Sequence, residues 1–195
     1  IAPKDSMARY RTLGVDCVAG RGRVVDPHHV EVAGQVLSTR SIVIATGARP
    51  FVPPIPGLAE VGPLTSDDVW TLEALPRRLL VLGGGPIGCE LAQSFARLGA
   101  AVTLVDLEPR LLPREDPEVG EFVAGIMRRE GVDVRLGHRA LRVEPAAMPG
   151  AGILVAQSAA GEVSMEFDRI LVAVGRRPTT EGLGLEALGI AAGPN

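Results

Sequence analysis

The stretch VLGGGPIGCE, residues 81–90, decides the fold because it places three successive glycines, and a fourth soon after, between two regular patterns. The apolar run at 79–82 predicts a strand buried on both faces of a parallel sheet. After the glycines, apolar residues recur at helical spacing as far as Gly99, which suits a helix C-terminus. Residues 101–105 predict a second strand that ends at Asp106. Strand, helix and strand in this order form a βαβ unit.

The glycines follow the spacing Gly83-x-Gly85-x-x-Gly88, which is a dinucleotide-binding pattern. The first glycine permits a tight turn, the second lets the backbone approach a pyrophosphate, and the third lets helix and strand pack closely. Pro86 suits the first helical position. In this pattern, an acidic residue roughly 20 residues after the glycines binds the ribose 2′-hydroxyl. Asp106 lies at about this distance from Gly83. Glycine-rich turns also occur without a ligand, but the strand, helix, second strand and acid together favour dinucleotide binding.

Two more helices are predicted from their start signals. Asp116 suits an N-cap and Pro117 suits the first helical position, which predicts a helix that ends near residues 130–131. Ser66, followed by two acidic residues, predicts a helix ahead of the βαβ unit that stops at Pro76.

The sequence also repeats itself in two blocks. GVDCVAG at 14–20 resembles GVDVRLG at 131–137, and IVIATGARP at 42–50 aligns with ILVAVGRRP at 170–178. Short alternating strands are predicted between the blocks, and each copy closes on a buried-strand pattern. The repeat predicts two related folds. Too few residues precede Gly14 for a second βαβ unit, so we expect the chain to be the middle of a longer protein.

Composition excludes several classes of function. The 195 residues carry a net charge of −3, which argues against binding to nucleic acid or an anionic membrane surface. No apolar run approaches the roughly 20 residues that span a bilayer. Cys17 and Cys89 are far apart and have no metal-ligand spacing with the histidines, so no metal site is expected. Two lone cysteines suit a reducing cytoplasm, and Cys89 is expected to be a packed thiol.

With both repeats in view, the chain resembles the flavin-dependent pyridine nucleotide–disulfide oxidoreductases, which include dihydrolipoamide dehydrogenase and mercuric reductase. The stretches that carry the resemblance are SIVIATGARP, VLGGGPIGCELAQSFARLGAAVTLVD, RLLPREDPEV and RILVAVGRRPTTEGLGLEALGI. The resemblance implies an α/β, Rossmann-like FAD/NAD(P)-binding fold with a parallel sheet plus a β-meander. It implies a partial FAD-binding domain at 1–65, an NAD-binding domain at 66–178 and a segment at 179–195 that returns toward the FAD domain.

The resemblance also implies a function for the longer protein. Such an enzyme passes hydride from NADH to FAD and on to a disulfide or metal substrate, usually as a homodimer. The family's CxxxxC redox pair and FAD-binding GxGxxG lie upstream of the residues present, and neither Cys17 nor Cys89 sits in a CxxxxC pattern. We therefore expect no catalytic residue in this chain and no activity from the chain alone. Its partners would be NADH, FAD and the remainder of the flavoenzyme.

Site residues follow from the matching positions. The resemblance implies NAD contacts at Gly83, Gly85, Pro86, Ile87, Gly88, Glu90, Asp106, Val143 and Gly175, and FAD contacts at Gly22, Ala45, Thr46 and Gly47. Pro86 replaces the aromatic gate of some members, so no gating ring is expected. Glu90 matches an acid near the nicotinamide, although a solvated first-turn glutamate would look the same. Val143 matches a residue beside adenine, although a valine in a strand is more often core.

Cofactor choice depends on the acid at the end of the second strand. A carboxylate at Asp106 favours the free 2′-hydroxyl of NAD and repels the phosphate of NADP. Arg110 is the counter-argument, since it lies four residues on and would favour NADP if it reached that phosphate. The prediction is NAD, with NADP as the alternative.

Two other functions use the same glycine pattern. A free-standing NAD-dependent dehydrogenase is one, but a tyrosine–lysine relay beside the βαβ unit is impossible because Tyr10 and Lys4 are the only residues of those types. A non-catalytic dinucleotide-sensing module is the other. The repeat favours the flavoenzyme over both.

Overall fold

The computed structural model describes residues 6–191 and 193. The chain divides into two compact units. One runs from Arg49 to Arg177, and the other combines the residues up to Ala48 with those from Pro178 onward. We call them the central unit and the flanking unit, and describe each by itself.

A parallel sheet forms the middle of the central unit. Its strands are β5 (Arg78–Leu82), β6 (Ala101–Val105), β7 (Asp133–Arg135) and β11 (Arg169–Val172), in the order β11-β5-β6-β7. Each neighbouring pair is parallel. The two strands expected on either side of the glycine-rich stretch are confirmed as β5 and β6.

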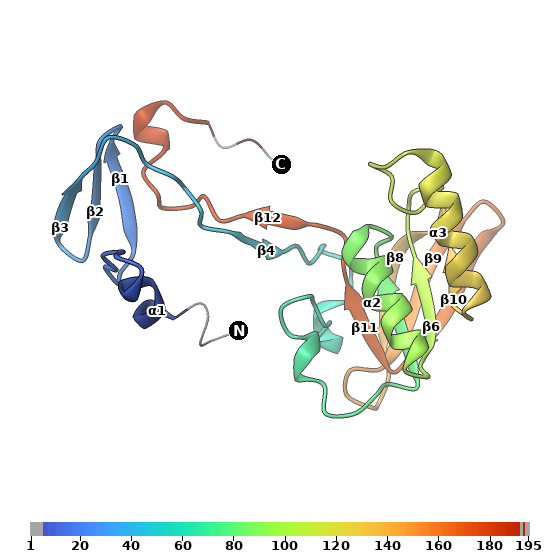
Figure 1. Cartoon of the computed structure of the whole chain (residues 1–195). Helices are drawn as coiled ribbons and strands as arrows, with labels where there is room; N and C mark the ends of the chain where they lie inside the picture. The colour runs from blue at the N-terminus through green and yellow to red at the C-terminus, as the bar shows by residue number, and fades with distance from the viewer. Residues whose placement is uncertain (1–5, 192, 194–195) are drawn as a thin grey trace. The chain divides into compact units, whose positions relative to one another are not determined.

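Two helices cover one face of this sheet (Figure 1). They are α2 (Pro86–Arg97) and α3 (Pro117–Arg129), and each has proline at its start, as predicted. Proline suits this position because the amide that it lacks has no partner within the helix.

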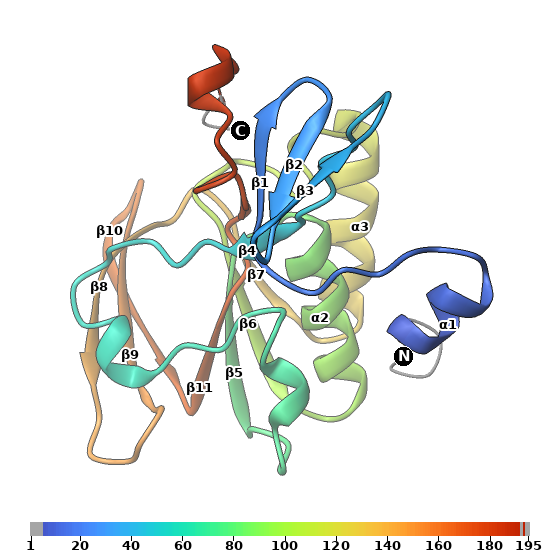
Figure 2. The same cartoon turned by 90° about the vertical axis from the view of Figure 1, so that its left-hand side faces the viewer.

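The opposite face of the sheet is covered by an antiparallel meander (Figure 2). It consists of β8 (Arg139–Pro145), β9 (Gly152–Ser158) and β10 (Gly161–Phe167), in the order β10-β9-β8. The predicted α/β fold with a parallel sheet and a β-meander is therefore confirmed.

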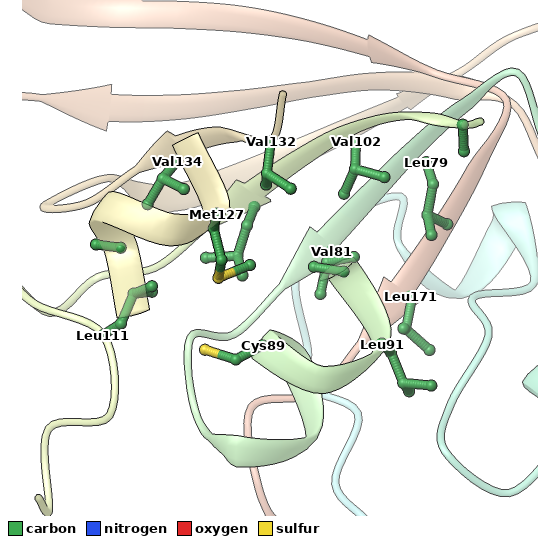
Figure 3. Packing of buried hydrophobic residues seen from close by; sticks show 14 of the residues in the cluster. Leu79, Val81, Cys89, Leu91, Val102, Leu111, Met127, Val132, Val134 and Leu171 are labelled. Atoms are coloured by element: carbon green, nitrogen blue, oxygen red, sulfur yellow. The ribbon is translucent and has the colours of Figure 1, made fainter. Parts of the chain in front are cut away.

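The sheet has a hydrophobic core on each face because its strands alternate. Leu79 and Val81 of β5 pack with the helices, whereas Leu80 and Leu82 of the same strand pack with the meander. Figure 3 shows the helix-side cluster, in which Cys89 lies among the buried side chains. A strand buried on both faces is apolar along its whole length, and this is why the run at 79–82 lacks polar residues.

An ion pair joins the ends of the two helices. Glu130 follows α3 and accepts hydrogen bonds from Arg97 Nε at 2.8 Å, Arg97 Nη2 at 2.6 Å and Gln93 Nε2 at 3.0 Å. The Arg97 guanidinium is the main reason that the pKa of Glu130 lies below its ordinary value of 4.5.

This pair makes a small part of the stability depend on pH. Because the pKa of Glu130 is lower in the folded chain, its stabilisation is present above pH 4.5 and is lost as pH falls through the folded pKa. Glu130→Gln should therefore lower the melting temperature slightly at pH 7, and the difference from wild type should shrink steadily below pH 4.5. Thermal melts of both proteins across this range measure it, and a constant difference would contradict the assignment.

The helix predicted to start at Ser66 is wrong. The structure has only a short 3-10 helix, η2 (Val69–Thr71), in that segment. Asp68 instead accepts hydrogen bonds from the amide and hydroxyl of Thr65, at 2.5 and 3.1 Å. Trp70 Nε1 donates to Ser66 O at 2.9 Å. These local side-chain bonds compete with helical backbone bonds and stabilise a turn.

The remaining short elements of the central unit are η1 (Ala59–Val61) and a bridge between Leu64 and β11. The flanking unit contains α1 (Met7–Thr12), η3 (Glu186–Leu188) and an antiparallel sheet of β1 (Gly22–Asp26), β2 (His29–Val32) and β3 (Gln35–Ser38). Two further strands, β4 (Ala48–Pro50) and β12 (Arg176–Pro178), form a separate two-stranded sheet.

The strand expected at the start of the 42–50 block is also wrong. Residues 41–47 are not in a strand, and the Val43 side chain is 86% exposed. In the matching block, β11 is a strand because it pairs with β5. No described residue offers a strand ladder to 41–47. A strand requires a neighbour to share its hydrogen bonds, so two similar sequences adopt different structures here.

Candidate dinucleotide-binding site

Packing explains why the first and third glycines of the pattern carry no side chain. Gly83 has φ +117°, and a Cβ there would lie 2.5 Å from Ala173 O, at the end of β11. A Cβ on Gly88 would lie 1.9 Å from Gly83 O. Helix α2 therefore touches the end of β5 at Gly88, with no room for another atom between them.

The second glycine is different because it faces open space. A Cβ on Gly85 would meet no atom within 4 Å, and Gly85 has an ordinary φ of −73°. It is the N-cap of α2, followed by the exposed Pro86. The first amides of a helix, here those of Ile87 and Gly88, lack intrahelical acceptors and attract anions. Neither packing against the described residues nor backbone conformation requires a glycine at 85, and the space in front of it is open.

Asp106 lies beside this loop at the carboxyl end of β6. Its Oδ2 accepts a hydrogen bond from the amide of Gly84, and its Oδ1 accepts one from the amide of Glu108 at 2.7 Å. The residue is half-buried. Each carboxylate oxygen keeps lone-pair capacity for a further donor. The arrangement presents a fixed acceptor next to the helix N-terminus.

Arg110 is held within its own loop. Its Nη2 donates to Pro113 O at 2.7 Å, and its Nη1 donates to Glu115 O at 3.2 Å. A guanidinium engaged with two carbonyl groups must break these bonds before it can turn toward a phosphate near Asp106.

Residues 4–195 match the family described as pyridine nucleotide-disulphide oxidoreductase. The chain belongs to this family. Similar proteins include a dihydrolipoyl dehydrogenase of Thermus scotoductus, 38% identical over 90% of this chain and 38% of that protein. A mercuric reductase of Lysinibacillus sphaericus is 39% identical over 92% of this chain and 33% of that protein.

A solved structure agrees with these relatives. The HOCl-induced flavoprotein disulfide reductase RclA from Escherichia coli superposes with a TM-score of 0.77 at 32% identity, over 95% of this chain and 43% of that one. The chain thus spans less than half the length of each of these pyridine nucleotide-disulphide oxidoreductases.

Other predicted NAD contacts lie in varied surroundings. Glu90 is exposed on α2, and Ile87 is half-buried against the helix-side core. Gly175 follows β11 with φ +141°, and a Cβ there would meet nothing within 4 Å. It lies at the same carboxyl edge of the parallel sheet as the glycine-rich loop, where ligands bind in doubly wound folds.

Val143 is set apart from these residues. Its side chain is 4% exposed and packs in the meander-side core, while its amide donates to Pro56 O at 2.8 Å. It has almost no side-chain surface to offer an adenine ring, so its position is that of a core residue.

The predicted FAD contacts lie in the flanking unit. Gly22 begins β1, opposite Val32 of β2. Ala45, Thr46 and Gly47 lie in the segment without a strand. The Thr46 hydroxyl donates to Thr179 O at 2.5 Å.

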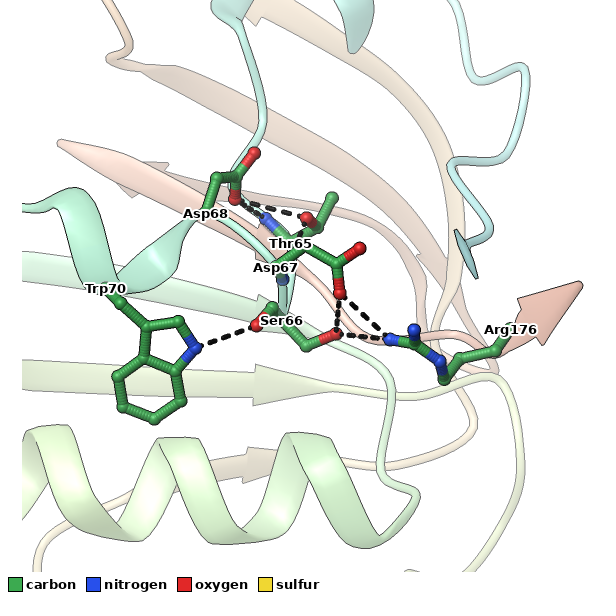
Figure 4. A network of polar contacts seen from close by, with 6 residues as sticks. All are labelled: Thr65, Ser66, Asp67, Asp68, Trp70 and Arg176. Atoms are coloured by element: carbon green, nitrogen blue, oxygen red, sulfur yellow. Dashed lines mark hydrogen bonds and ion pairs between the residues drawn. The ribbon is translucent and has the colours of Figure 1, made fainter. Parts of the chain in front are cut away.

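Two arginines near the end of the central unit have specific partners. Arg176 Nη1 donates to Ser66 Oγ at 2.8 Å and to Asp67 Oδ1 at 3.1 Å (Figure 4). The Arg177 guanidinium lies 4.0 Å above the centre of the Phe51 ring. Neither contact is predictable from the sequence, because the partners of both arginines are remote in the sequence.

Sequence reasoning also missed Gly84 and Leu112. Leu112 N donates to Gly84 O at 2.9 Å, and Leu112 has φ +50°, which is unusual for a residue with a side chain. The run of three glycines is a sequence signal for Gly84, the middle one. No sequence signal predicts a positive φ at a leucine such as Leu112.

Cys89 is a packed thiol, as predicted. Burial, together with the charges of Asp106 and Glu90, raises its pKa to about 11, so it stays protonated at neutral pH. Among the described residues, no group of three or more His, Cys, Asp or Glu side chains has an arrangement that could hold a metal ion. The helices of residues 6–191 are all too short or too polar to cross a membrane.

Proposed function

We propose that the central unit binds NAD(H) as part of an FAD-dependent pyridine nucleotide–disulfide oxidoreductase that passes hydride from NADH to FAD and on to a disulfide or metal substrate. The observation that carries the proposal is the contrast among the glycines. Gly83 and Gly88 are required by packing, whereas Gly85 faces open space at a helix N-terminus. Family membership supports the same conclusion.

Each part of the site has a task in this proposal. The amides of Ile87 and Gly88 bind the pyrophosphate at the start of α2. Asp106 accepts a hydrogen bond from the adenosine ribose. Gly175 leaves room for the nicotinamide end, where the exposed Glu90 is a candidate to bind the carboxamide. Pro86 places no aromatic ring over this end.

When bound, NADH supplies a hydride and FAD supplies the acceptor for it. The residues of this chain bind and orient the nucleotide. Cys89 is buried, with a pKa of about 11, and it does not suit a redox-active thiolate. Neither Cys17 nor Cys89 sits in a CxxxxC pattern, so we propose that the thiols that act on the substrate belong to another part of the full protein and that the chain alone is inactive.

The whole protein extends the proposal beyond the central unit. Gly22, Ala45, Thr46 and Gly47 would contact FAD, as in the family pattern. The resemblance favours a homodimer, and the two lone cysteines favour a cytoplasmic location.

Cofactor preference tests the proposal directly. We expect the chain to bind NADH at least about tenfold more tightly than NADPH, because the fixed Asp106 carboxylate accepts from a hydroxyl and repels a phosphate. Asp106→Ser should shrink the preference, mainly by tighter NADPH binding. Calorimetric titration of both nucleotides measures it. Binding of neither would refute the proposed site, and tighter binding of NADPH would transfer the selective role to Arg110.

A further inference from the structure

The backbone of Gly84, the middle glycine, is held at both its amide and its carbonyl group. Its amide donates to Asp106 Oδ2. Its carbonyl oxygen accepts from Leu112 N at 2.9 Å and from the Cys89 thiol at 3.4 Å. These partners come from the end of β6, the loop before α3, and α2. The amide and carbonyl groups of Gly84 thus contact the acid, the loop and the helix of the candidate site.

Resting on the proposed function, we infer that Gly84 is a specificity-determining position that fixes the Asp106 carboxylate against NADPH. The dinucleotide pattern assigns roles to the glycines on either side of it and leaves this position unspecified. Its contact with Asp106 gives it a role of its own.

Neighbouring side chains leave no room for a Cβ atom at position 84. A Cβ on Gly84 would lie 2.7 Å from Leu111 Cδ2 and 3.0 Å from Asp106 Oδ2. Leu111 is completely buried and has little freedom to move, whereas Asp106 is half-buried at the surface of the site. Gly84 does not have a positive φ, so alanine suits its backbone. The effect of a side chain would therefore fall on the carboxylate.

The loop before α3 holds the carbonyl group of Gly84. Leu112 adopts φ +50°, a conformation that is unfavourable for a residue with a side chain. In this conformation its amide reaches Gly84 O. Strained backbone persists where its surroundings require it, and here it provides the contact with the Gly84 carbonyl oxygen.

The fixed carboxylate explains selectivity. Asp106 accepts from the amides of both Gly84 and Glu108, so it cannot rotate away from a phosphate without leaving two donors unpaired. A carboxylate with only the Glu108 bond would turn more easily. Discrimination against the 2′-phosphate then depends on Gly84 as well as on the charge of Asp106.

The test compares Gly84→Ala with Gly85→Ala in the 195-residue chain. Titration calorimetry gives dissociation constants for NADH and NADPH, and far-UV circular dichroism and thermal melts verify the fold. Gly84→Ala should reduce the NADH-over-NADPH ratio by about fivefold or more, mainly through tighter NADPH binding. Gly85→Ala, whose Cβ points into the space for the pyrophosphate, should weaken both nucleotides by a similar factor and leave the ratio unchanged.

The outcomes separate the two proposals. If Gly85→Ala weakens both nucleotides but Gly84→Ala leaves the ratio unchanged, the inference about Gly84 is overturned and the proposed function stands. If Gly85→Ala affects neither nucleotide, the proposed site itself fails. If Gly84→Ala destabilises the chain, a second pair of variants replaces it. The double variant Gly84→Ala, Leu111→Ala lacks the clash with Leu111, and it is compared with Leu111→Ala alone. An unchanged ratio between those two variants would equally overturn the inference.

Discussion

Gly85→Val is expected to abolish measurable NADH binding while the chain stays folded. The valine side chain would fill the open space in front of α2, where the helix amides are proposed to bind the pyrophosphate. Loss of two hydrogen bonds to a charged group corresponds to a decrease in affinity of about a hundredfold or more. Gly85 has φ −73°, so valine requires no strained backbone and should change the melting temperature little.

Calorimetric titration with NADH, together with far-UV circular dichroism, distinguishes loss of the ligand site from loss of the fold. NADPH binding should be lost as well, because both nucleotides share the pyrophosphate. Wild-type affinity for NADH in Gly85→Val would remove the functional interpretation of the glycine pattern.

Gly88→Ala, unlike Gly85→Val, is expected to lower the stability of the fold. It should destabilise the central unit by about 3 kcal/mol or more. Its Cβ would lie 1.9 Å from the backbone oxygen of Gly83, and backbone at the end of a buried strand cannot move aside cheaply. The matched control is Gly125→Ala in α3, where the nearest atom to the new Cβ is the flexible Arg129 Nη1 at 3.6 Å.

Gly125→Ala should stabilise the chain by about 0.5–1 kcal/mol, since alanine favours the helix over glycine. Urea unfolding followed by far-UV circular dichroism measures both variants. Equal effects of the two substitutions would show that helix propensity, and not the contact between α2 and β5, decides the requirement for glycine at 88.

The βαβ unit was predictable because its signals are local. An apolar run, a glycine-rich turn and a helical repeat each act within a few residues, and the start of α2 at Pro86 followed from one proline. The same reasoning failed at Ser66, where the carboxylate of Asp68 and the ring of Trp70 bond nearby groups of the turn. Start signals for a helix and for an Asx-type turn use the same residue types.

Features that depend on remote partners could not be predicted. Residues 42–46 and 170–174 have nearly equal patterns, but only the second block has a strand beside it. The conformation of Leu112 follows from the position of the Gly84 carbonyl, which is known only once the chain has folded. The candidate site shows the same division: the places of the glycine-rich loop and of Asp106 in the fold were predictable, whereas the hydrogen bonds that hold Asp106 were not.

The segment without a strand also affects how the chain behaves in solution. Residues 42–44 are isoleucine, valine and isoleucine, which favour β structure, and Val43 and Ile44 are 86% and 45% exposed. Their backbone has no strand ladder among the described residues. An exposed apolar segment with free β-pairing capacity is a template for pairing between molecules. Self-association of this chain at high concentration would therefore begin at 42–44, far in sequence from the glycine-rich loop.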